Sequence, residues 1–376
     1  MKIGILTFHC AHNYGAMLQC YALQEYMKRH RHEVYVIDYR PNYLLKGYLR
    51  HSFRHWCSKN PLRAIKKLIS EPLLYRDRGI RWDAFDEFMK TKFNLYPYDP
   101  LSDYSDFDLL LLGSDQIWSY SITGGQFDPV FFGQGFKCCK VTYAASMSPI
   151  LLSDRDRKTL SCYLRNIDVI SVREAALAEE IHTFVDNEIR VVCDPVFLLE
   201  NEEWENFCIP LTIKRPYVLC YNIQESEDCN KLANQISREL GYDLFYITPC
   251  LTPLKFGHHY LQTLSPIEFV SYIRQAAFVI TSSFHGTVFS VVFKKPFYTI
   301  GMGNKAGRVT SFLEKIGLSN RLLLHVPTTI DVEIDYARVG FLLERYRGES
   351  MEFLDFNKDI CESVKYQEPV SYTHLT

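Results

Sequence analysis

Thr281-Ser-Ser-Phe-His-Gly-Thr-Val-Phe-Ser290 is the stretch that decides the fold. It follows an apolar run, Ala276-Ala-Phe-Val-Ile280, which predicts a buried parallel strand, and it leads into a predicted helix over residues 288–293. The order of strand, small hydroxyl-bearing turn and helix N-terminus is typical of the edge of an open α/β sheet where ligands bind, because free helix amides and the helix dipole favour an anion. His285 lies in this turn beside Gly286, which leaves room for a ligand to approach the backbone. The alternative interpretation is a Ser/Thr helix cap with an incidental histidine.

The length, composition and net charge of the chain limit the class of protein to which it can belong. At 376 residues it is too long for one ordinary core, so two domains are expected. The hydrophobic share of 47% suits a globular protein, and no apolar run approaches the roughly 18 residues of a membrane span. The N-terminus, Met1-Lys-Ile-Gly-Ile-Leu-Thr-Phe8, lacks the features of a signal peptide and predicts a strand instead. The net charge of −2 does not indicate a nucleic-acid partner.

The twelve cysteines are scattered, with no Cys-x-x-Cys and one adjacent pair, Cys138-Cys139. Metal sites and disulfide frameworks need tighter spacing, so the sequence predicts neither. Buried, reduced thiols in a cytoplasmic protein are the better interpretation.

The beginning of the chain predicts a complete βαβ unit. Residues 2–8 form a strand, residues 16–27 carry apolar side chains at helical spacing, and residues 33–38 alternate as a second strand. Crossovers of this kind are almost always right-handed. Asn13 and Gly15 lie at the first strand-to-helix turn, but the Gly-x-Gly-x-x-Gly fingerprint is absent, so a dinucleotide cofactor is not expected.

Residues 46–81 differ from the rest of the chain in composition. They hold ten Lys and Arg residues against Glu71 and Asp77, interleaved with aromatic and aliphatic residues. One interpretation is a helical insertion with a solvated basic face, and the other is a surface that lies on anionic lipid. The first is favoured, because Pro61 and Pro72 are expected to break any long helix.

Phe107-Asp-Leu-Leu-Leu-Leu-Gly-Ser-Asp-Gln-Ile-Trp118 predicts a buried strand with polar residues crowded at its carboxyl end. A sugar ring needs directed hydrogen bonds and an apolar face to stack on. The residues that offer both are Ser114, Asp115, Gln116 and Trp118. The alternative is a capped turn whose tryptophan belongs to the core.

Arg173 lies at the carboxyl end of another predicted strand, residues 167–172, and opens a predicted helix over residues 175–181. An arginine there can hold a carboxylate or a phosphate bidentately. The alternative is an ion pair with a nearby glutamate. A further strand and then Asp194-Pro195 close the first half of the chain.

The second half repeats the alternation after a charged boundary at residues 200–204. Its predicted strands are residues 217–221, 244–248, 276–280 and 297–300, and its other predicted helices are residues 228–240, 266–275 and 309–316. The loop Gly301-Met-Gly-Asn-Lys-Ala-Gly-Arg308 carries Lys305 and Arg308, and its backbone amides could cradle a phosphate. Residues 331–347 predict a terminal amphipathic helix, and residues 367–376 predict a disordered tail.

Four stretches together resemble the polysaccharide pyruvyl transferase family. They are Asn13-Tyr-Gly-Ala-Met-Leu-Gln19, Gly113-Ser-Asp-Gln-Ile-Trp118, Ser171-Val-Arg-Glu174 with Cys193-Asp-Pro195, and Ser283-Phe-His-Gly-Thr-Val-Phe-Ser290. Each motif alone is modest, but their order and spacing agree across residues 2–345. The resemblance implies an α/β fold of two Rossmann-like α/β/α domains in a GT-B-like arrangement with an interdomain cleft. Residues 1–199 would form the acceptor side, residues 200–347 the donor side and residues 348–376 a tail.

The reaction that the resemblance implies moves the enolpyruvyl carbon of phosphoenolpyruvate onto two hydroxyls of a sugar, which forms a pyruvate ketal and releases phosphate. In the family an Arg-x-His pattern helps to bind this donor. The histidine corresponds to His285 here, whereas Ser283 stands at the arginine position, so Arg173 and Arg308 are expected to supply the cation. The expected donor-binding residues are Ser283, Gly286, Thr287, Lys305 and Arg308, and the expected acceptor-binding residues are Asn13, Tyr14, Gly15, Ser114, Asp115, Gln116 and Trp118.

The chemistry asks for the same residue types. Phosphoenolpyruvate brings a phosphate and a carboxylate, so at least two cations or helix ends should converge on it. Protonation of the enol carbon suits a group that titrates near neutrality, so His285 is expected to be the general acid or, in a weaker version, a hydrogen-bond donor to the phosphate. Arg173 is the second expected catalytic residue, and no metal or other cofactor is expected. The acceptor would be a sugar of a cell-surface polysaccharide or its precursor, and a lipid-linked precursor would place the protein at the inner face of the membrane.

Two other functions fit the same residues. A GT-B glycosyltransferase would use a nucleotide sugar, whose diphosphate the loop over residues 301–308 could hold. A non-catalytic carbohydrate-binding or assembly protein would keep the cleft without the donor site. Competition between phosphoenolpyruvate and nucleotide sugars would separate these alternatives.

Overall fold

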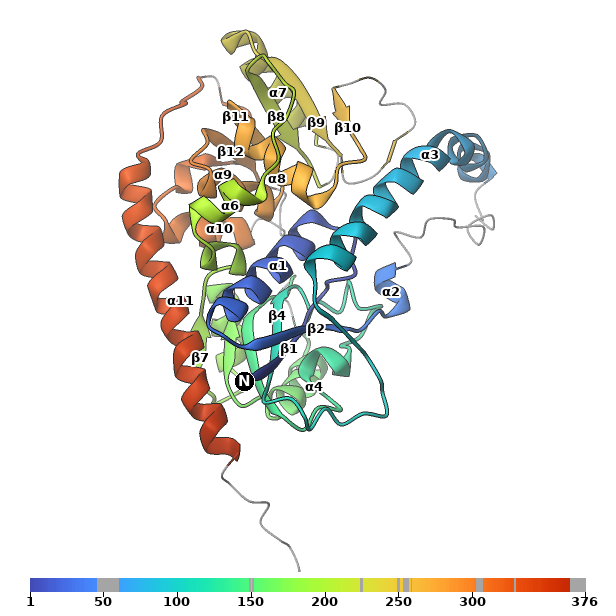
Figure 1. Cartoon of the computed structure of the whole chain (residues 1–376). Coiled ribbons are helices and arrows are strands. Elements are labelled where there is room, and N and C mark those ends of the chain that lie inside the picture. The colour runs from blue at the N-terminus through green and yellow to red at the C-terminus, as the bar shows by residue number, and fades with distance from the viewer. Residues whose placement is uncertain are drawn as a thin grey trace, which may run out of the picture.

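The computed structural model describes residues 1–45, 61–148, 150, 152–223, 226–248, 251–252, 257, 259–301, 307–327 and 329–365, with no description of the side chains of residues 61–71 and 356–365. Two lobes lie one above the other (Figure 1), and each is built on a parallel sheet with helices packed against it. The predicted fold class, two Rossmann-like α/β domains in a GT-B-like arrangement, is confirmed.

The first sheet has the order β3-β2-β1-β4-β5-β6-β7, and its strand pairs are parallel. Its register places Ile3 of β1 between Val34 of β2 and Leu109 of β4. The chain order reverses between β1 and β4, which is the switch point where ligands bind in such sheets. The strands are β1 (Lys2–Leu6), β2 (Glu33–Asp38), β3 (Leu95–Pro97), β4 (Leu109–Asp115), β5 (Cys139–Ala145), β6 (Ile170–Val172) and β7 (Ile189–Val191).

The second sheet has the order β10-β9-β8-β11-β12-β13 and is also parallel, with its switch point between β8 and β11. The predicted strand over residues 276–280 is β11, which starts two residues later, and the predicted strands at β8 and β12 have the predicted bounds. The strands are β8 (Tyr217–Tyr221), β9 (Asp243–Ile247), β10 (Tyr260–Leu261), β11 (Phe278–Thr281), β12 (Phe297–Ile300) and β13 (Leu322–Leu323).

The helices connect successive strands, as parallel pairing requires. Their caps follow the sequence: Ser265 and Glu268 form a capping box on α8, and Gly241, at φ 66°, ends α7 in the left-handed conformation. The helices are α1 (Tyr14–Arg29), α2 (Asn42–Leu45), α3 (Pro61–Lys92), α4 (Asp154–Leu164), α5 (Ala175–His182), α6 (Asn201–Phe207), α7 (Glu227–Leu240), α8 (Pro266–Gln275), α9 (Phe284–Val292), α10 (Gly307–Lys315) and α11 (Tyr336–Lys365), with 3₁₀ turns η2 (Pro129–Phe132), η3 (Pro195–Leu198) and η5 (Ser319–Arg321).

The predicted tail over residues 348–376 is wrong as far as residue 365, because α11 continues to Lys365. The helix runs along both lobes (Figure 1) and returns to the first one. The Tyr346 hydroxyl donates to the Val192 carbonyl at 2.9 Å, and the Ser350 hydroxyl accepts from the Cys193 amide at 2.8 Å. These contacts with the first lobe order a segment whose sequence alone gave no reason to fold. Residues 366–376 lie outside the described residues.

The prediction that Pro61 and Pro72 break any long helix is also wrong, because α3 spans 32 residues with Pro72 inside it. Pro61 occupies the first helical position, where its missing N–H is not needed. Pro72 is exposed, so water can satisfy the carbonyl that loses its partner. Residues 46–60 of the basic segment lie outside the described residues.

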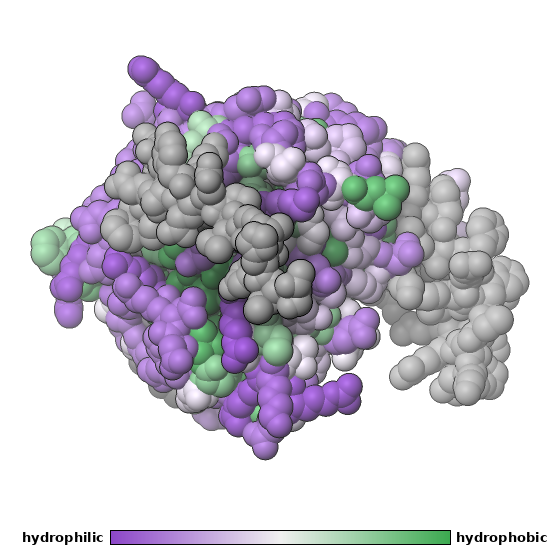
Figure 2. Space-filling view, turned by 90° about the horizontal axis from the view of Figure 1, so that it is seen from below, coloured by the Kyte–Doolittle hydropathy of each residue, from purple (hydrophilic) through white to green (hydrophobic). Residues whose placement is uncertain are grey.

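The surface and the cysteines of the described residues bear on predictions made from the sequence. Seen from below, the visible surface is mostly hydrophilic, with hydrophobic residues gathered near the middle of the view and others scattered singly (Figure 2). Within the described ranges, no helix combines the length and the hydropathy needed to cross a bilayer. Most described cysteines carry free thiols, as predicted, but Cys139 takes part in a disulfide.

Candidate functional site

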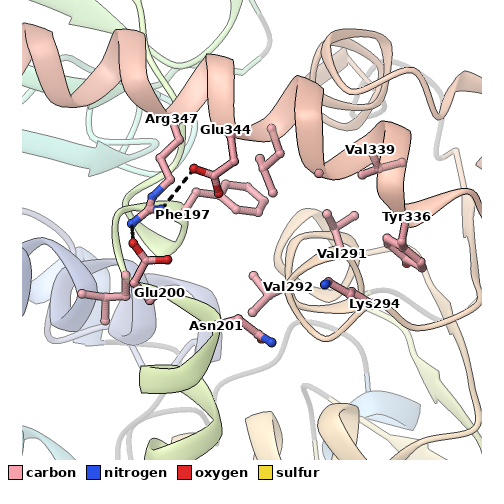
Figure 3. A pocket seen from close by; sticks show the side chains of 13 residues that line it. Phe197, Glu200, Asn201, Val291, Val292, Lys294, Tyr336, Val339, Glu344 and Arg347 are labelled. Atoms are coloured by element: carbon pink, nitrogen blue, oxygen red, sulfur yellow. Dashed lines mark hydrogen bonds and ion pairs between the residues drawn. The ribbon is translucent and has the colours of Figure 1, made fainter.

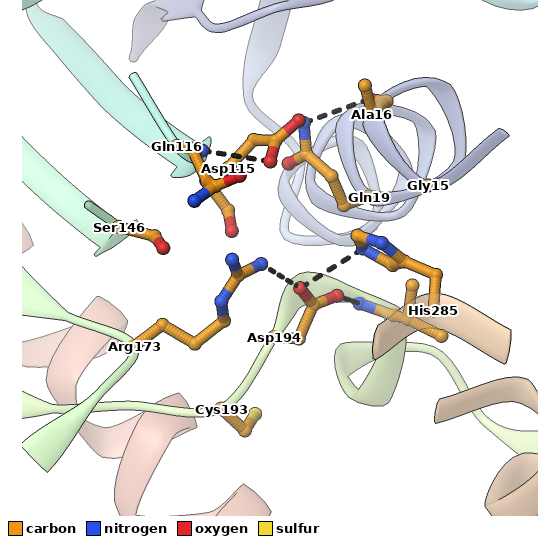
Figure 4. A network of polar contacts seen from close by, with 12 residues as sticks. Gly15, Ala16, Gln19, Asp115, Gln116, Ser146, Arg173, Cys193, Asp194 and His285 are labelled. Atoms are coloured by element: carbon orange, nitrogen blue, oxygen red, sulfur yellow. Dashed lines mark hydrogen bonds and ion pairs between the residues drawn. The ribbon is translucent and has the colours of Figure 1, made fainter. Parts of the chain in front are cut away.

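The switch points of the two sheets meet between the lobes. After β1, Asn13 caps α1 and Gly15 lies in its first turn. After β11, His285 lies in the first turn of α9, which begins four residues earlier than predicted. Gly15 and His285 are so close that a Cβ added to Gly15 would lie 2.0 Å from His285 Nδ1. Asp115, at the end of β4, and Arg173, just after β6, lie around the same point (Figure 4). The site therefore draws on the carboxyl ends of strands from both sheets.

His285 is the second residue of α9. The Ser283 hydroxyl caps this helix by accepting from the Gly286 amide at 3.2 Å, which fixes the first turn and the direction of the imidazole. The side chain is 9% exposed, and its Nε2 lies 3.4 Å from Asp194 Oδ2. The contact joins the second lobe to the segment that follows β7 in the first lobe. A carboxylate at this distance can stabilise positive charge on the imidazole during a proton transfer.

Asp194 contacts both Arg173 and His285. Its Oδ2 accepts from Arg173 Nη1 at 2.8 Å, and its Oδ1 accepts from the Val196 amide at 3.1 Å, which caps η3. Burial raises the pKa of a carboxyl group, but His285 first and then Arg173 outweigh it and lower the pKa of Asp194 to about 2. Asp194 is therefore a buried group at the centre of the site that is ionised at neutral pH.

Arg173 has a second carboxylate, since its Nε donates to Glu174 Oε1 at 3.1 Å. The Ser146 hydroxyl donates to the same Glu174 oxygen at 2.8 Å. Burial alone would lower the pKa of Arg173, but the charges of Glu174 and Asp194 outweigh it and raise the pKa. The guanidinium lies over the Phe284 ring at 4.5 Å. Arg173 therefore forms the ion pair with a glutamate that the alternative interpretation predicted. This ion pair occupies only part of the guanidinium group.

Two buried nitrogen atoms of the arginines in this region, Arg173 Nη2 and Arg308 Nε, have no hydrogen-bond partner within the described part of the chain. His285 Nε2 makes no hydrogen bond of good geometry either, but it is paired with Asp194 Oδ2 at 3.4 Å. Arg308 lies in the first turn of α10. Burial lowers the pKa of Arg308, and the nearby positive charge of Arg173 lowers it further. The two guanidinium groups are therefore close enough to repel each other. Buried donors are nearly always paired, so a set of unpaired ones on cationic groups indicates a place for an anion.

Three expected donor residues, Ser283, Gly286 and Thr287, make contacts within the protein. Ser283 caps α9, as described above. Gly286 packs against Thr281, whose Oγ1 would lie 2.3 Å from an added Cβ, so its close approach is to the protein and not to a ligand. Thr287 is buried and its hydroxyl bonds to the Ser283 carbonyl and to Thr299 Oγ1 at 2.7 Å. These contacts show that the three residues build the N-terminus of α9, and their role in donor binding stays a prediction.

Lys305 lies outside the described residues, so its predicted role has no structural account. Within the described ranges, no group of three or more His, Cys, Asp or Glu residues is arranged to hold a metal ion.

Two expected acceptor residues are placed elsewhere. The indole of Trp118 is fully buried, stacks on Phe132 with centroids 5.5 Å apart and donates to the Phe131 carbonyl at 3.3 Å. Tyr14 is also buried, stacks on Phe269 at 4.4 Å and donates to a carbonyl of the second lobe. Neither ring has a free face for a sugar, so the acceptor assignment of both residues is corrected: Trp118 is a core residue and Tyr14 joins the lobes.

The remaining acceptor residues do lie at the site. Asn13 is exposed and caps α1 by accepting from the Gly15 and Ala16 amides. Asp115 and Gln116 are half-buried at the end of β4, and the Asp115 carboxylate accepts from the Gln116 amide at 2.8 Å. The Ser114 hydroxyl is buried without a partner among the described residues. These groups offer a polar face next to His285, although their role toward a sugar stays a prediction.

Asp194 is not among the site residues predicted from the sequence, and a glutamate such as Glu174 enters there only as the alternative partner of Arg173. Both residues belong to motifs, and both lie within three residues of the end of a strand of the first sheet. The usable signal was a carboxylate at the carboxyl end of a parallel strand, next to a proline in one case and an arginine in the other. Their value depends on His285 and Arg173 lying beside them, which is tertiary information.

A pocket of about 310 Å³ lies near the site without belonging to it (Figure 3). Its walls include the far end of η3 and the far end of α9, whereas Asp194 and His285 lie at the starting ends of the same elements. Its polar lining residues are Glu200, Asn201, Lys294, Tyr336, Glu344 and Arg347, of which Arg347 is paired with Glu200 and Glu344. The pocket is therefore separate from the polar cluster around His285.

Replacing Gly15 by alanine is expected to displace the His285 ring, because the new methyl group would overlap with Nδ1. A shift of about 1 Å in a catalytic group can cost about 10²-fold in rate, so activity should fall by that order while the protein still folds. Steady-state kinetics and circular dichroism measure both. Gly348→Ala is the matched control, since nothing lies within 4 Å of an added Cβ there. Equal activity of the two variants would show that the ring position does not matter.

Known proteins resemble this arrangement to different degrees. The family model described as polysaccharide pyruvyl transferase matches residues 13–304. No curated protein matches the chain. Among solved structures, the chain is similar to the UDP-GlcNAc 2-epimerase from Methanocaldococcus jannaschii, with 10% identity over 92% of this chain and 92% of that one and a TM-score of 0.45. It is also similar to a UDP-N-acetylglucosamine 2-epimerase from Rickettsia bellii (11% identity, 95% and 97% covered, TM-score 0.43) and to a glycosyltransferase from Rickettsia africae (12%, 98% and 99%, 0.41).

Proposed function

Because the chain belongs to the polysaccharide pyruvyl transferase family, a family of transferases, we propose that it moves the enolpyruvyl group of phosphoenolpyruvate onto two hydroxyls of a saccharide to form a pyruvate ketal. The acceptor in this proposal is a sugar of a cell-surface polysaccharide or of its precursor. The location in the proposal is the cytoplasm, where phosphoenolpyruvate is made.

One observation carries the proposal: the unpaired buried nitrogens of Arg173 and Arg308 lie in one region, beside the ion pair of His285 with Asp194. Phosphoenolpyruvate has a phosphate and a carboxylate, and each needs charged donors when it leaves water. The N-termini of α9 and α10 add partial positive charge from the second lobe. Arg173 and Arg308 thereby replace the cation that Ser283, at the family's arginine position, does not supply.

The reaction balances with these groups. Carbon 3 of the enolpyruvyl group gains a proton, both acceptor oxygens bond to carbon 2, and the bond from carbon 2 to the phosphate oxygen breaks. Of the two hydroxyl protons, one is accounted for in the new methyl group and the other leaves on phosphate. His285 transfers the proton to carbon 3, Asp194 holds the imidazole and balances its charge, and the arginines stabilise the departing phosphate.

The first test is thermal stabilisation of the native protein by phosphoenolpyruvate. A ligand that binds only the native state stabilises it by about 2.7 kcal/mol at a concentration of 100 times its dissociation constant, so the melting temperature should rise by a few degrees. We expect this rise with phosphoenolpyruvate, and we expect it to disappear in Arg308→Ala. Differential scanning fluorimetry measures it.

The control is Arg190→Ala, an exposed arginine paired with Glu188 on the far end of the first sheet, which should keep the full shift. A rise with UDP-sugars and none with phosphoenolpyruvate would contradict the proposal and favour glycosyl transfer. The absence of any shift with either ligand would favour a non-catalytic carbohydrate-binding protein.

A further inference from the structure

The outer half of α3 exposes large apolar side chains. Leu73 is 59% exposed, Tyr75 62% and Ile80 43%, all within eight residues of one helix. Leu73, Arg76 and Ile80 are spaced three and four residues apart, so they share one face. The helix projects away from the body of the molecule (Figure 1), which leaves this face without a partner element in the described chain. Exposed apolar side chains gathered in this way mark an interaction surface.

The same part of the helix is basic. Residues 61–80 contain five Lys and Arg residues against Glu71 and Asp77, in a chain whose net charge is −2. Arg76 is exposed and belongs to the apolar face described above. The partner of this surface must therefore be negatively charged and must also accept leucine and isoleucine side chains.

We propose that this face of α3, made of Leu73, Arg76 and Ile80, binds the surface of an anionic lipid bilayer. On such a helix the apolar side chains are buried at the boundary between headgroups and acyl chains. Their basic neighbours attract the anionic headgroups. Nucleic acid would account for the arginines and leave the aliphatic side chains in water. A bilayer accounts for both.

The inner end of the same helix is anchored at the junction of the lobes. Arg81 is buried, lies over the rings of Tyr14 and Phe85, and donates from Nη1 to the carbonyls of Thr248 and Gln262 at 3.0 and 3.2 Å. The helix thus spans from the membrane-binding face to the second lobe. Bilayer binding through α3 would hold the junction of the lobes at a fixed place relative to the lipid surface, whatever reaction the site performs.

The test is co-sedimentation of the full chain with sucrose-loaded vesicles of phosphatidylcholine, alone or with 30% phosphatidylglycerol. We expect binding to the anionic vesicles and much weaker binding to the neutral ones, with a marked loss when the salt concentration is raised. Arg76→Glu should weaken the partition coefficient about fivefold or more, since each basic residue near an anionic surface contributes about that factor. The double variant Leu73→Glu, Ile80→Glu should abolish binding.

Leu101→Glu is the matched control, because Leu101 is 93% exposed on a different part of the first lobe and should bind like the wild type. Melting temperatures of all variants should stay within about one degree of the wild type, since the replaced side chains are exposed. No sedimentation with anionic vesicles would overturn the proposal, and so would an equal loss of binding in Leu101→Glu. Tight binding to a short DNA duplex that competes with the vesicles would overturn it in favour of nucleic acid.

Discussion

Replacing His285 by alanine is expected to lower kcat by about 10²-fold or more, with a smaller effect on the apparent affinity for phosphoenolpyruvate. General acid catalysis by a positioned side chain contributes about 10²–10⁴-fold, and His285 is the imidazole that lies between Asp194 and the first turn of α1. Loss of a group that acts in the transition state lowers kcat and kcat/KM together. Steady-state kinetics with a phosphate-release assay would measure both constants.

His285→Gln separates proton transfer from hydrogen bonding. Glutamine keeps a hydrogen-bond donor for the phosphate, so near-wild-type kcat in this variant would mean that His285 only binds the donor. A loss as large as that of the alanine variant, together with a flattened pH–rate profile, would assign the proton transfer to His285. His182→Ala, at the exposed end of α5, should leave both constants unchanged.

Much of the fold could be predicted from the sequence because the strands and helices of parallel sheets have local sequence signals. Buried strands are continuous apolar runs, and the helices between them carry start and stop signals such as the capping box of α8 and the glycine that ends α7. The turn that holds His285 was found by the same logic. What local signals could not decide was how far a helix continues when its partner is distant, as α11 does along the first lobe.

The site was only partly accessible. His285 and Arg173 could be named from their places at strand ends, but the pairing of both with Asp194 depends on the approach of the two lobes. For Trp118 the interpretation from the sequence was wrong. A tryptophan beside polar residues at a strand end suits a sugar site, and here its packing against Phe132 and its bond to the Phe131 carbonyl place it in the core. Burial of a single side chain is set by tertiary packing, which local sequence does not encode.

Asp194→Asn is expected to destabilise the protein by about 3–5 kcal/mol at neutral pH, which is the usual cost of removing one partner of a buried ion pair. The change removes charge with little change of shape, and asparagine keeps an oxygen for the Val196 amide, so the cap of η3 survives. What is lost is the counter-charge for Arg173 and the partner of His285. Urea unfolding of both proteins measures the difference, and Glu188→Gln, from an exposed ion pair, should cost about 0–1 kcal/mol.

The pH dependence of the stability difference shows whether the charge of Asp194 is the cause. The pKa of Asp194 is lowered to about 2 in the folded protein, against about 3.9 in an unfolded chain, so its charge stabilises the fold above the unfolded value. The difference between wild type and Asp194→Asn should therefore be full at pH 7 and should shrink as the pH falls from about 4 toward about 2. A difference that stayed constant over that range would mean that shape and hydrogen bonding, and not charge, make Asp194 necessary. In that case the low pKa of Asp194 could not be the reason that His285 and Arg173 are held together, and the site would owe its geometry to packing between the lobes.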